Sequence, residues 1–597
     1  MKKYNFKHII PVALSSLVIL YACNKSYLEV PAAGALSQDV LANKVGVEAL
    51  LVGAYSLLDG EGSSAGTGNG PWATSSSNWV YGSVAGGDAH KGSDPGDQNL
   101  ITPIEKWSAT ASNGYLDQLW QQRYDGVQRS NEAIRVLKLA KDVSAADVTR
   151  ITAEARFLRG HYHFDLAKFF GNIPYIDETV TYAAGNYMVA NAGVAAALAK
   201  IEADFKYAYD NLPESQASAG AGQGVGRANK WAAAAYLGKV YMFEKKYAEA
   251  KAILTTVITS GKTNTGVKYA LVPKFGDIFD ISKKNSSENV FSVQMTVNDG
   301  TGAANANSGD ALNFPYGGET GCCGFFQPSF SLANAFKVDA NGLPFLDESY
   351  NDVPLKTDMG ISADKAFTPD SVTPMDPRVD WTIGRRGVPY LDWGIMPGST
   401  WVRDQGSAGP YEPLKHLFRK SQIGVFTDGS SWTNGFTANN YPLIRLADVI
   451  LLAAEAEIET GGLEAARAYV NQVRTRAANP DGFVGPANNA GKASPTNYKI
   501  GTYTAAWTDA ATARKAVRFE RKLELAMEGH RFSDLTRWGT GATELNAYAK
   551  SELAQGYSTM AGASYTTGKS EYLPLPQNQI DKMQKDGKSV LTQNPGY

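Results

Sequence analysis

The sequence predicts a mainly α-helical protein: a scaffold of helical hairpins with a large loop-rich, partly β region inserted into it. Apolar residues recur at helical spacing in many segments of the 597-residue chain. Two of these segments, 227–260 and 443–476, have the helix–turn–helix pattern of a tetratricopeptide repeat. Between them, residues 262–440 are rich in Gly and Pro and contain only short strand-like runs such as Asn289–Val297. We therefore expect a variable, loop-rich face on a helical-repeat scaffold.

Five helical segments are predicted before residue 262, because each carries an apolar stripe of helical period. They cover 45–54, 115–140, 154–170, 195–212 and 227–260. The third is followed by Gly171 and Pro174, which are typical residues after a helix C-terminus. In the last, the small residues Gly238 and Ala250 allow two helices to pack closely. Residues 60–78 and 82–100 are rich in Gly, Ser, Asn and Asp and are predicted as loops.

The second hairpin runs through 443–476 and turns at Gly461-Gly462. Its first helix has an apolar stripe of six residues: Leu443, Leu446, Ala447, Ile450, Ala454 and Ile458. Residues 479–505 form a further predicted loop, and a last long helix is expected over 511–530. The chain thus divides into an N-terminal helical part (23–261), a loop-rich part (262–440) and a C-terminal helical part (441–597).

The composition excludes some classes of function. Lys and Arg number 57 and Asp and Glu 59, a formal charge of −2, so no basic field exists to hold nucleic acid. Only six His residues are present, which leaves little for metal binding or acid–base chemistry, and we expect no cofactor. Aromatic residues make up 11% of the chain, including 30 Tyr and 11 Trp, beside 59 Gly. This mixture is typical of a binding protein with large flat side chains in its loops.

The N-terminus indicates export. A basic start, Met1–Lys3, precedes the apolar stretch Ile9–Ala22. At about 14 residues this stretch is too short to span a bilayer and fits a secretory signal peptide over residues 1–22. Ala22 directly before Cys23 resembles a bacterial lipobox, so Cys23 is the predicted site of lipidation and would anchor the protein to the membrane. Ordinary cleavage near Ala22, which leaves a free thiol on Cys23, is the alternative.

Five stretches, in order along the chain, resemble the SusD/RagB family of outer-membrane nutrient-binding lipoproteins. They are the start at Cys23 with Tyr27-Leu28 and Pro31, the helix Glu154–Pro174, Tyr441–Ala456, Arg518–Trp538, and the tail formed by Tyr572–Pro576 and Leu591–Tyr597. Together they span the whole chain after the signal peptide, which makes the resemblance far more specific than one short motif.

The resemblance implies a single domain over 23–597, built on four tetratricopeptide-like hairpins, with a loop-rich face that holds the ligand. Family members bind oligosaccharides, or more rarely other nutrients, at the cell surface and pass them to a SusC-like TonB-dependent outer-membrane transporter. They carry out no chemistry, so the resemblance implies a lipid-anchored outer-membrane protein that is not an enzyme. A surface glycoside hydrolase and a structural or peptide-binding lipoprotein remain open, as does the identity of the glycan.

Loop aromatic residues are the best candidates for ligand contacts. Sugars present apolar C–H faces that stack on aromatic rings and hydroxyl groups that bind polar side chains. Two predicted loop clusters combine both types of residue: the first is Trp72, Trp79, Tyr81, Asp88, Lys91 and Asp94, and the second Arg385, Tyr390, Trp393 and Trp401. Packing inside a loop core is an equally open interpretation for each of the Trp residues.

The chain has only three Cys residues, and Cys322 and Cys323 are adjacent. Because the cell surface is oxidising, a vicinal disulfide between them is one hypothesis. It needs a distorted or cis peptide, since consecutive Cα atoms lie about 3.8 Å apart across a trans peptide. The ring would lie beside Phe325 and Phe326 as a floor under a sugar. A reduced, buried pair is the equally open alternative.

Two groups of carboxylates are interpreted as structural. Glu520, Glu524 and Glu528 follow one another at intervals of four, near Arg518, Arg521 and Arg531. Such a pattern is more typical of a salt-bridged helix face than of a glycosidase acid–nucleophile pair. Asp88, Asp94 and Asp97 share a Gly-rich loop but lack the spacing of a known Ca²⁺ loop, so turn and capping roles are favoured and no metal is predicted.

Overall fold

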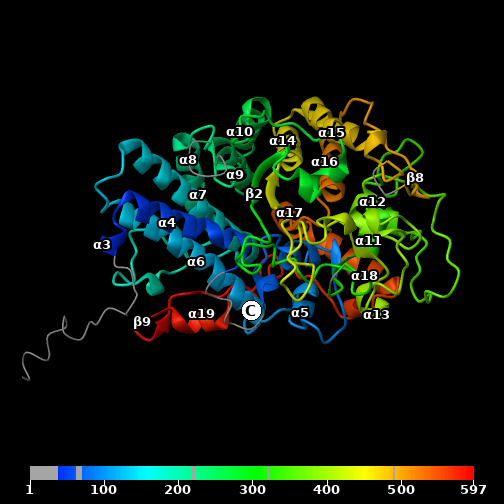
Figure 1. The fold of residues 1–597 in the computed structure, drawn as a ribbon, viewed down its shortest axis with the longest axis horizontal. Helices are drawn as coiled ribbons and strands as arrows, with labels where there is room; N and C mark the ends of the chain where they lie inside the picture. Colours follow the sequence, from blue (N-terminus) through cyan, green and yellow to red (C-terminus); the bar gives the residue numbers. More distant parts are fainter. Residues whose placement is uncertain (1–37, 62–69, 218–223, 321, 488–490) are drawn as a thin grey trace, which may run out of the picture.

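The computed structural model describes residues 38–61, 70–217, 224–320, 322–487 and 491–597. The predicted signal peptide and the lipidation site Cys23 lie outside these residues. Figure 1 shows a layer of helices from the left to the upper right, with loops and further helices in the lower right. Within the described part of the chain, no helix combines the length and the apolar character needed to cross a membrane. The predicted fold class, mainly helical with an irregular loop region, is confirmed.

The N-terminal part is an array of helices in which each packs against the next along the chain. The short helix α3 (Gln38–Leu41) precedes them. The array consists of α4 (Lys44–Ser56), α6 (Gly114–Leu137), α7 (Ala145–Phe170), α8 (Val194–Asn211), α9 (Lys230–Phe243) and α10 (Tyr247–Ser260). All the predicted helices of this part are present, and α7 begins nine residues earlier than the predicted start at 154.

The α9–α10 hairpin shows how the sequence pattern produces close packing. A Cβ atom on Gly238 would lie only 2.5 Å from Cδ2 of Leu254, so only glycine lets the two helices approach this closely. Asn229 caps α9, its side chain accepting hydrogen bonds from the backbone N–H groups of Trp231 and Ala232. At the end of α7, Gly171 has a φ of 64°, a conformation that favours glycine and stops the helix as predicted.

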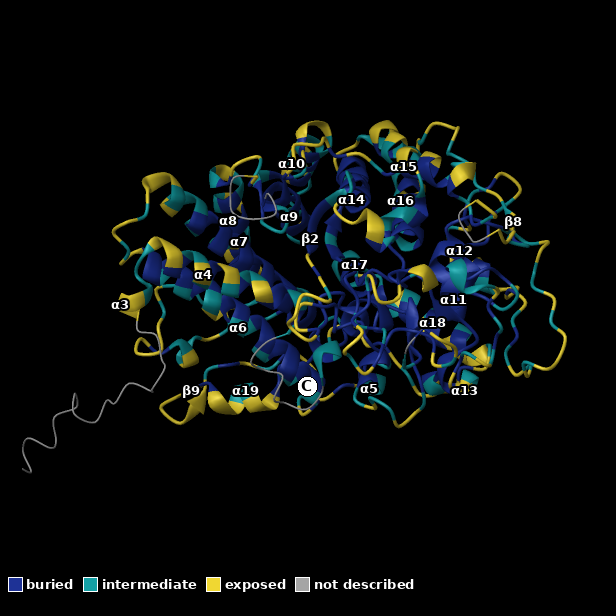
Figure 2. Cartoon of the chain, viewed as in Figure 1, coloured by how far each residue is buried: buried dark blue, intermediate teal, exposed yellow. Residues whose placement is uncertain are grey.

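The C-terminal part continues the array. It contains α14 (Leu446–Glu459), α15 (Leu463–Ala477), α16 (Ala510–Glu524), α17 (Arg531–Trp538), α18 (Gly541–Ala554) and α19 (Gln577–Lys582). Helix α14 packs against α10 and α16, which joins the two helical parts. Figure 2 shows that exposed residues follow the outer surface of the array and the loop tips, whereas the interior around α14 and α17 is buried.

Two predictions for this part were wrong in their boundaries. Leu443 lies in strand β7 (Tyr441–Arg445), which pairs antiparallel with β2 (Asn289–Val293), so the helix starts at Leu446. Strand β2 supplies the hydrogen-bond partners of residues 441–445, so these residues do not join the helix. The helix expected over 511–530 ends at Glu524, because the backbone turns through positive φ at Met527 (63°) and Gly529 (73°) before α17.

The loop-rich part has little regular structure but a core of its own. Its short helices are α11 (Phe330–Ala335), α12 (Val379–Thr382) and α13 (Gln405–Ala408), and α5 (Ile101–Glu105) lies in the earlier loop. Two-stranded pairs join β1 (Ala89–Gly92) to β3 (Phe325–Pro328), β4 (Pro374–Met375) to β8 (Asn497–Tyr498), β5 (Ile383–Gly384) to β6 (Glu412–Pro413), and β9 (Gln584–Lys585) to β10 (Lys588–Ser589). A second apolar cluster around Phe275, Trp381, Tyr390 and Phe418 lies beneath these loops.

The three glutamates at intervals of four form a buried ion network and not an exposed helix face. Glu524 accepts hydrogen bonds from Arg378 (2.8 Å) and Arg445 (2.6 Å), and Glu528 from Arg445 (2.7 Å) and Lys415 (2.7 Å). All of these side chains are buried. The structural interpretation is therefore supported, but the cations come from segments distant in sequence. The expected partners bind elsewhere: Arg521 pairs with Asp448 and Asp534, and Arg531 with Glu544.

Candidate functional site

Six of the ten predicted ligand contacts are buried inside the protein. They are Trp79, Tyr81, Asp88, Lys91, Arg385 and Tyr390, each no more than 7% exposed. Because a bound sugar must touch accessible atoms, these residues are removed from the candidate site. Their aromatic and charged groups are instead used within the fold, where packing of large rings and pairing of buried charges hold the loops in place.

The buried aromatic residues form the support under the loops. Trp79 lies in a single-turn π-helix (Trp79–Val84), and its Nε1 donates a hydrogen bond to the carbonyl of Gly309 (3.2 Å). Its ring packs against Phe325 and Phe326, with centroids 6.2 and 5.7 Å away. The hydroxyl of Tyr81 donates to the carbonyl oxygens of Ala73 or Tyr115, both within 3.0 Å. These residues are loop core, which was the alternative interpretation.

The buried polar residues fix the loop backbone. A carboxylate oxygen of Asp88 accepts a hydrogen bond from the backbone N–H of Met527 (3.0 Å), and burial raises the pKa of Asp88 to about 6. Lys91 donates from Nζ to the carbonyl oxygens of Asp94 (2.6 Å) and Asp97 (2.7 Å), which closes the turn after β1. Arg385 pairs with Asp380 (2.6 Å), and the hydroxyl of Tyr390 donates to the carbonyl of Pro413 (2.5 Å).

Four predicted contacts remain partly accessible: Trp72, Asp94, Trp393 and Trp401. Trp72 donates from Nε1 to Oε1 of Gln98 (2.9 Å), and its indole lies against Gly70. Trp393 donates to the carbonyl of Phe418 (3.0 Å) and keeps part of its ring exposed.

Arg403 brings the two predicted clusters together. Arg403 lies two residues after Trp401 of the second cluster. Its guanidinium pairs with Asp94 (2.6 Å) and Asp97 (2.7 Å), which lie in the loop of the first cluster. The guanidinium also lies over the ring of Tyr316, 4.8 Å from its centroid. Tyr316 is 47% exposed, so a large flat ring backed by a fixed cation faces solvent here.

The segment after Tyr316 extends this surface to both tryptophans. The backbone N–H of Gly317 donates to the carbonyl of Trp401 (3.0 Å). A Cβ on Gly318 would lie 2.7 Å from Nε1 of Trp401, and its φ is 85°, so glycine is needed for the indole to lie against the backbone. The ammonium group of Lys420 forms an ion pair with Glu319 (3.0 Å). The same ammonium group lies 5.8 Å from the ring centroid of Trp393.

We call this surface the loop face: Asp94, Tyr316, Trp393, Trp401, Arg403 and Lys420. It combines accessible aromatic rings with paired cations and carboxylates, and its members come from four separate segments. Tyr316, Arg403 and Lys420 were not predicted from the sequence. The one signal for Tyr316 was an aromatic residue directly before Gly317-Gly318, the same pattern that singled out the loop tryptophans.

Cys322 and Cys323 lie next to the loop face. The structure joins their sulfur atoms in a disulfide across a cis peptide bond, and both residues are half-buried. Cys323 donates its backbone N–H to the carbonyl of Leu312 (2.9 Å). The expected neighbours Phe325 and Phe326 point into the core against Trp79, so the exposed aromatic residue of this segment is Tyr316.

The aspartates of the first cluster do not converge on a common point. Asp88 is buried against Met527, whereas Asp94 and Asp97 are bound to Arg403. Among the residues that the structure describes, no group of three or more His, Cys, Asp or Glu side chains has the arrangement of a metal site. The pKa of Asp94 is lowered, chiefly because its carboxylate accepts a hydrogen bond from the backbone N–H of Asp97.

Comparison with known proteins assigns the fold to a family. The sequence model of the SusD family matches residues 287–597, more than half of the chain. The chain belongs to the SusD family. A second family model, described as starch-binding associating with outer membrane, matches residues 71–242.

Individual relatives cover nearly the whole chain. The SusD-like protein P2 of Formosa agariphila is 24% identical over 534 residues, which is 86% of both chains. Among solved structures, a laminarin-binding SusD-like protein has a TM-score of 0.61 and 24% identity, covering 93% of this chain and all of that one. Surface glycan-binding protein A of Bacteroides thetaiotaomicron, in complex with laminarihexaose, has a TM-score of 0.60 and 20% identity, covering 92% and 99%.

Proposed function

We propose that this SusD-family protein binds glycans at the surface of the outer membrane through its loop face. The observation that carries the proposal is an accessible aromatic surface, in which Tyr316 is exposed and Trp401 and Trp393 are half-buried. Arg403 and Lys420 hold this surface in place. Two solved structures of the same fold support it, since one is a laminarin-binding protein and another holds laminarihexaose. The protein would then deliver its ligand to a SusC-like TonB-dependent transporter, as the family resemblance implies.

The loop face suits a sugar for physical reasons. The Tyr316 and Trp401 rings offer apolar surface for the C–H faces of a pyranose, and this burial gives most of the affinity. The guanidinium of Arg403 and the ammonium group of Lys420 carry several N–H donors, and each carboxylate oxygen of Asp94 and Glu319 has more than one lone pair, so these groups can bind hydroxyls in addition to their present partners. Because these groups are already paired with one another, they are held in place before the ligand arrives. A neutral glycan should therefore bind with modest affinity and little dependence on salt.

We propose that binding occurs without catalysis. A glycosidase needs one carboxylic acid that stays protonated near neutral pH, beside a second, ionised carboxylate. On the loop face, the pKa of Asp94 is lowered by hydrogen bonds from the backbone N–H groups of Asp97 and Gly96 and by Arg403, so this group stays ionised. Glu319 is bound to Lys420 and widely exposed.

We propose attachment to the outer membrane through a lipid on Cys23. The support is the apolar stretch before Cys23 and the family model whose description places its members in association with the outer membrane.

The experiment is affinity electrophoresis of residues 24–597 in gels containing laminarin, starch, xylan, fructan or no glycan. We expect retardation by one glycan class, weakened about tenfold in Tyr316→Ala because one stacking ring is lost. Tyr182→Ala is the matched control, since Tyr182 is 78% exposed and lies outside the loop face. Retardation that Tyr316→Ala and Trp401→Ala leave unchanged would contradict the assignment of the site. Cleavage of a glycan would favour the hydrolase alternative.

A further inference from the structure

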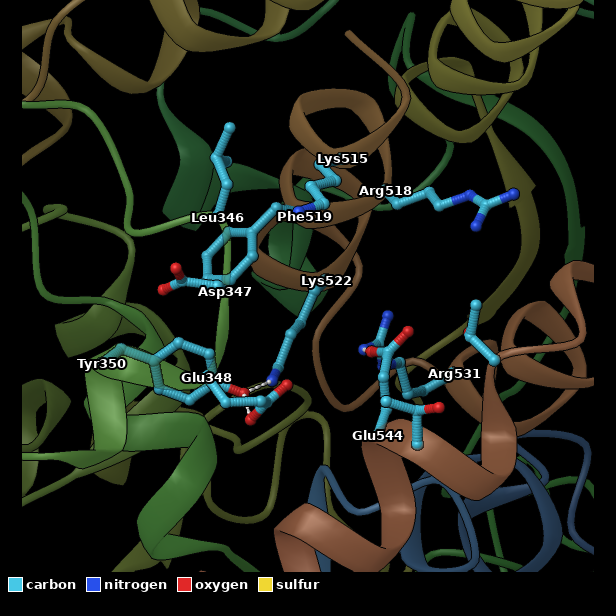
Figure 3. A pocket seen from close by; sticks show the side chains of 12 residues that line it. Leu346, Asp347, Glu348, Tyr350, Lys515, Arg518, Phe519, Lys522, Arg531 and Glu544 are labelled. Carbon is cyan, nitrogen blue, oxygen red and sulfur yellow. Dashed lines mark hydrogen bonds and ion pairs between the residues drawn. The ribbon is translucent and has the colours of Figure 1, made fainter. Parts of the chain in front are cut away.

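A cavity between the C-terminal helical part and residues 346–350 of the loop-rich part has the chemistry of a site for a charged ligand. It has a volume of about 330 Å³ and lies between α16, the N-terminus of α17, α18 and the turn Glu348–Asn351. Figure 3 shows Lys522 reaching from α16 toward Tyr350 and Glu348, with Arg531 and Glu544 across the cavity. The cavity shares no lining residue with the loop face.

Lys522 is a cation of the cavity that has no carboxylate within ion-pair distance among the described residues. Its ammonium group donates a hydrogen bond to the hydroxyl of Tyr350 (2.6 Å) and forms no ion pair with a carboxylate of the described chain. Tyr350 in turn donates to Glu348 (2.8 Å), so the Tyr350 hydroxyl lies between the Lys522 ammonium group and this carboxylate. Burial lowers the pKa of Lys522, and the charges of Glu348, Glu544 and Asp88 only partly oppose this effect.

Two further cations stand on the same face of α16. Lys515 and Arg518 precede Lys522 by seven and four residues and line the same cavity. The Nε of Arg518 is buried and has no hydrogen-bond partner among the described residues, while its guanidinium lies over the ring of Trp538 (4.8 Å). A buried donor of this kind costs free energy unless a water molecule or a ligand accepts its hydrogen bond. On the opposite wall, Arg531 is neutralised by Glu544.

The wall beside Lys522 is aromatic. Phe519 and Tyr350 contact each other edge to face, with centroids 5.7 Å apart, and the Lys522 ammonium lies 4.5 Å from the Tyr350 centroid. An anion alone would use the cations but leave this apolar wall empty. A ligand that joins an anionic group to an apolar ring face would use both, and carboxylates such as Glu348 can accept its hydroxyls.

We propose that this cavity binds an acidic sugar unit, a uronic acid or a sulfated monosaccharide, with the anionic group on Lys522 and the ring against Phe519. The choice of a sugar as carrier of the anion rests on the proposed glycan function, whereas the anion site itself does not. Such a site would let the protein recognise acidic substituents on a captured glycan separately from its neutral backbone at the loop face.

The test is saturation-transfer NMR with residues 24–597, which include every described residue. The probes are glucuronate, glucose 6-sulfate, glucose and inorganic sulfate at equal ionic strength. We expect one of the acidic sugars to bind more tightly than glucose and sulfate. Tighter binding of glucuronate would indicate a carboxylate site, and tighter binding of glucose 6-sulfate a sulfate ester site. Lys522→Met should weaken this binding at least about tenfold, because a charge-assisted hydrogen bond is lost. Lys522→Arg should retain it.

Lys550→Met is the matched control, since Lys550 is exposed on α18 and does not line the cavity. If Lys522→Met fails to fold, the wild-type protein still decides: acidic-sugar binding must weaken as salt rises, while laminarin retardation does not. Equal binding of glucose, sulfate that binds as tightly as the acidic sugars, or no binding at all would each overturn the proposal. If laminarin retardation is lost in Tyr316→Ala but kept in Lys522→Met, the proposed function of the loop face remains supported even when the cavity proposal fails.

Discussion

The α9–α10 hairpin is held by contacts between residues close in sequence, whereas the loop face is held by contacts between residues far apart in sequence. In the hairpin, Gly238 meets Leu254, sixteen residues away, and both ends of the contact lie in one sequence pattern. In the loop face, Arg403 meets Asp94, about 300 residues away, through a pairing that no local pattern records. The helical scaffold can thus be predicted from patterns among residues close in sequence. A site assembled from distant loops cannot be predicted in this way, because the contacts that position its loops join residues far apart in the chain.

The buried ion network joins the loop-rich part of the chain to the C-terminal helical part. Arg445 binds Glu288, which precedes β2, Glu524, the last residue of α16, and Glu528, which lies in the turn after that helix. Removing it with Arg445→Met leaves three buried carboxylates without their shared cation, which should cost about 3–5 kcal/mol of unfolding free energy. Urea unfolding would measure the loss. Lys206→Met, at the exposed Lys206–Asp210 pair, is the control and should leave the midpoint nearly unchanged. A similar midpoint in both variants would mean that the network does not hold the regions together.

Variants of Trp79 and Trp393 test the difference between a residue of the loop core and a residue of the loop face. Trp79 is fully buried, so Trp79→Ala should cost about 3–4 kcal/mol through lost packing and the cavity left behind. Trp393 is half-buried, and Trp393→Ala should cost much less stability but weaken glycan retardation. Urea unfolding and affinity electrophoresis on both variants separate the two effects. A stable Trp79→Ala protein that no longer binds glycan would return Trp79 to the binding site.

Acid should weaken the scaffold through the same network. Burial by itself would raise the pKa of Glu528, but the charges of Arg445 and Lys415 outweigh it and lower the pKa to about 2. An unfolded Glu titrates near pH 4.3, so the stabilisation is complete above that pH and is lost as the pH falls toward 2. The loss is of the order of 3 kcal/mol. Unfolding by urea at several pH values should show a smaller decline in Glu528→Gln, and an equal decline would exclude Glu528 as a cause.

The sequence predicted the scaffold well because each helix carries its own evidence. The apolar stripes, Asn229 as a cap and Gly171 as a stop all act within a few residues. Errors occurred where a distant partner decided the outcome: Leu443 has helical spacing but joins a strand because β2 lies beside it. The end of α16 was missed because Met527 takes a positive φ, and Asp88, from another region, binds its backbone N–H.

The candidate site was predicted less well, since composition identifies loops but not which side of a loop faces solvent. Trp79 and Trp401 occur in equally Gly-rich and polar sequence, yet one is core and the other accessible. Trp79 belongs to the main apolar core of the protein, whereas Trp401 only packs, partly buried, against the second apolar cluster under the loops. Arg403 escaped prediction because an isolated arginine has no signature until its carboxylate partners are known.

The smallest expected effect concerns the adjacent cysteines beside the loop face. At an oxidising cell surface, Cys322 and Cys323 should be bonded, so residues 24–597 should react with no thiol reagent before reduction and with two equivalents after it. Mass spectrometry after labelling measures this directly, and two free thiols in unreduced protein would contradict it. Opening the ring frees the backbone that positions Tyr316, so reduction should weaken glycan binding by only about threefold, as a loss of preorganisation. The Cys322→Ser, Cys323→Ser double variant should bind as weakly as the reduced protein and should not respond to reductant. A reductant effect that persists in this variant would have to arise elsewhere in the molecule.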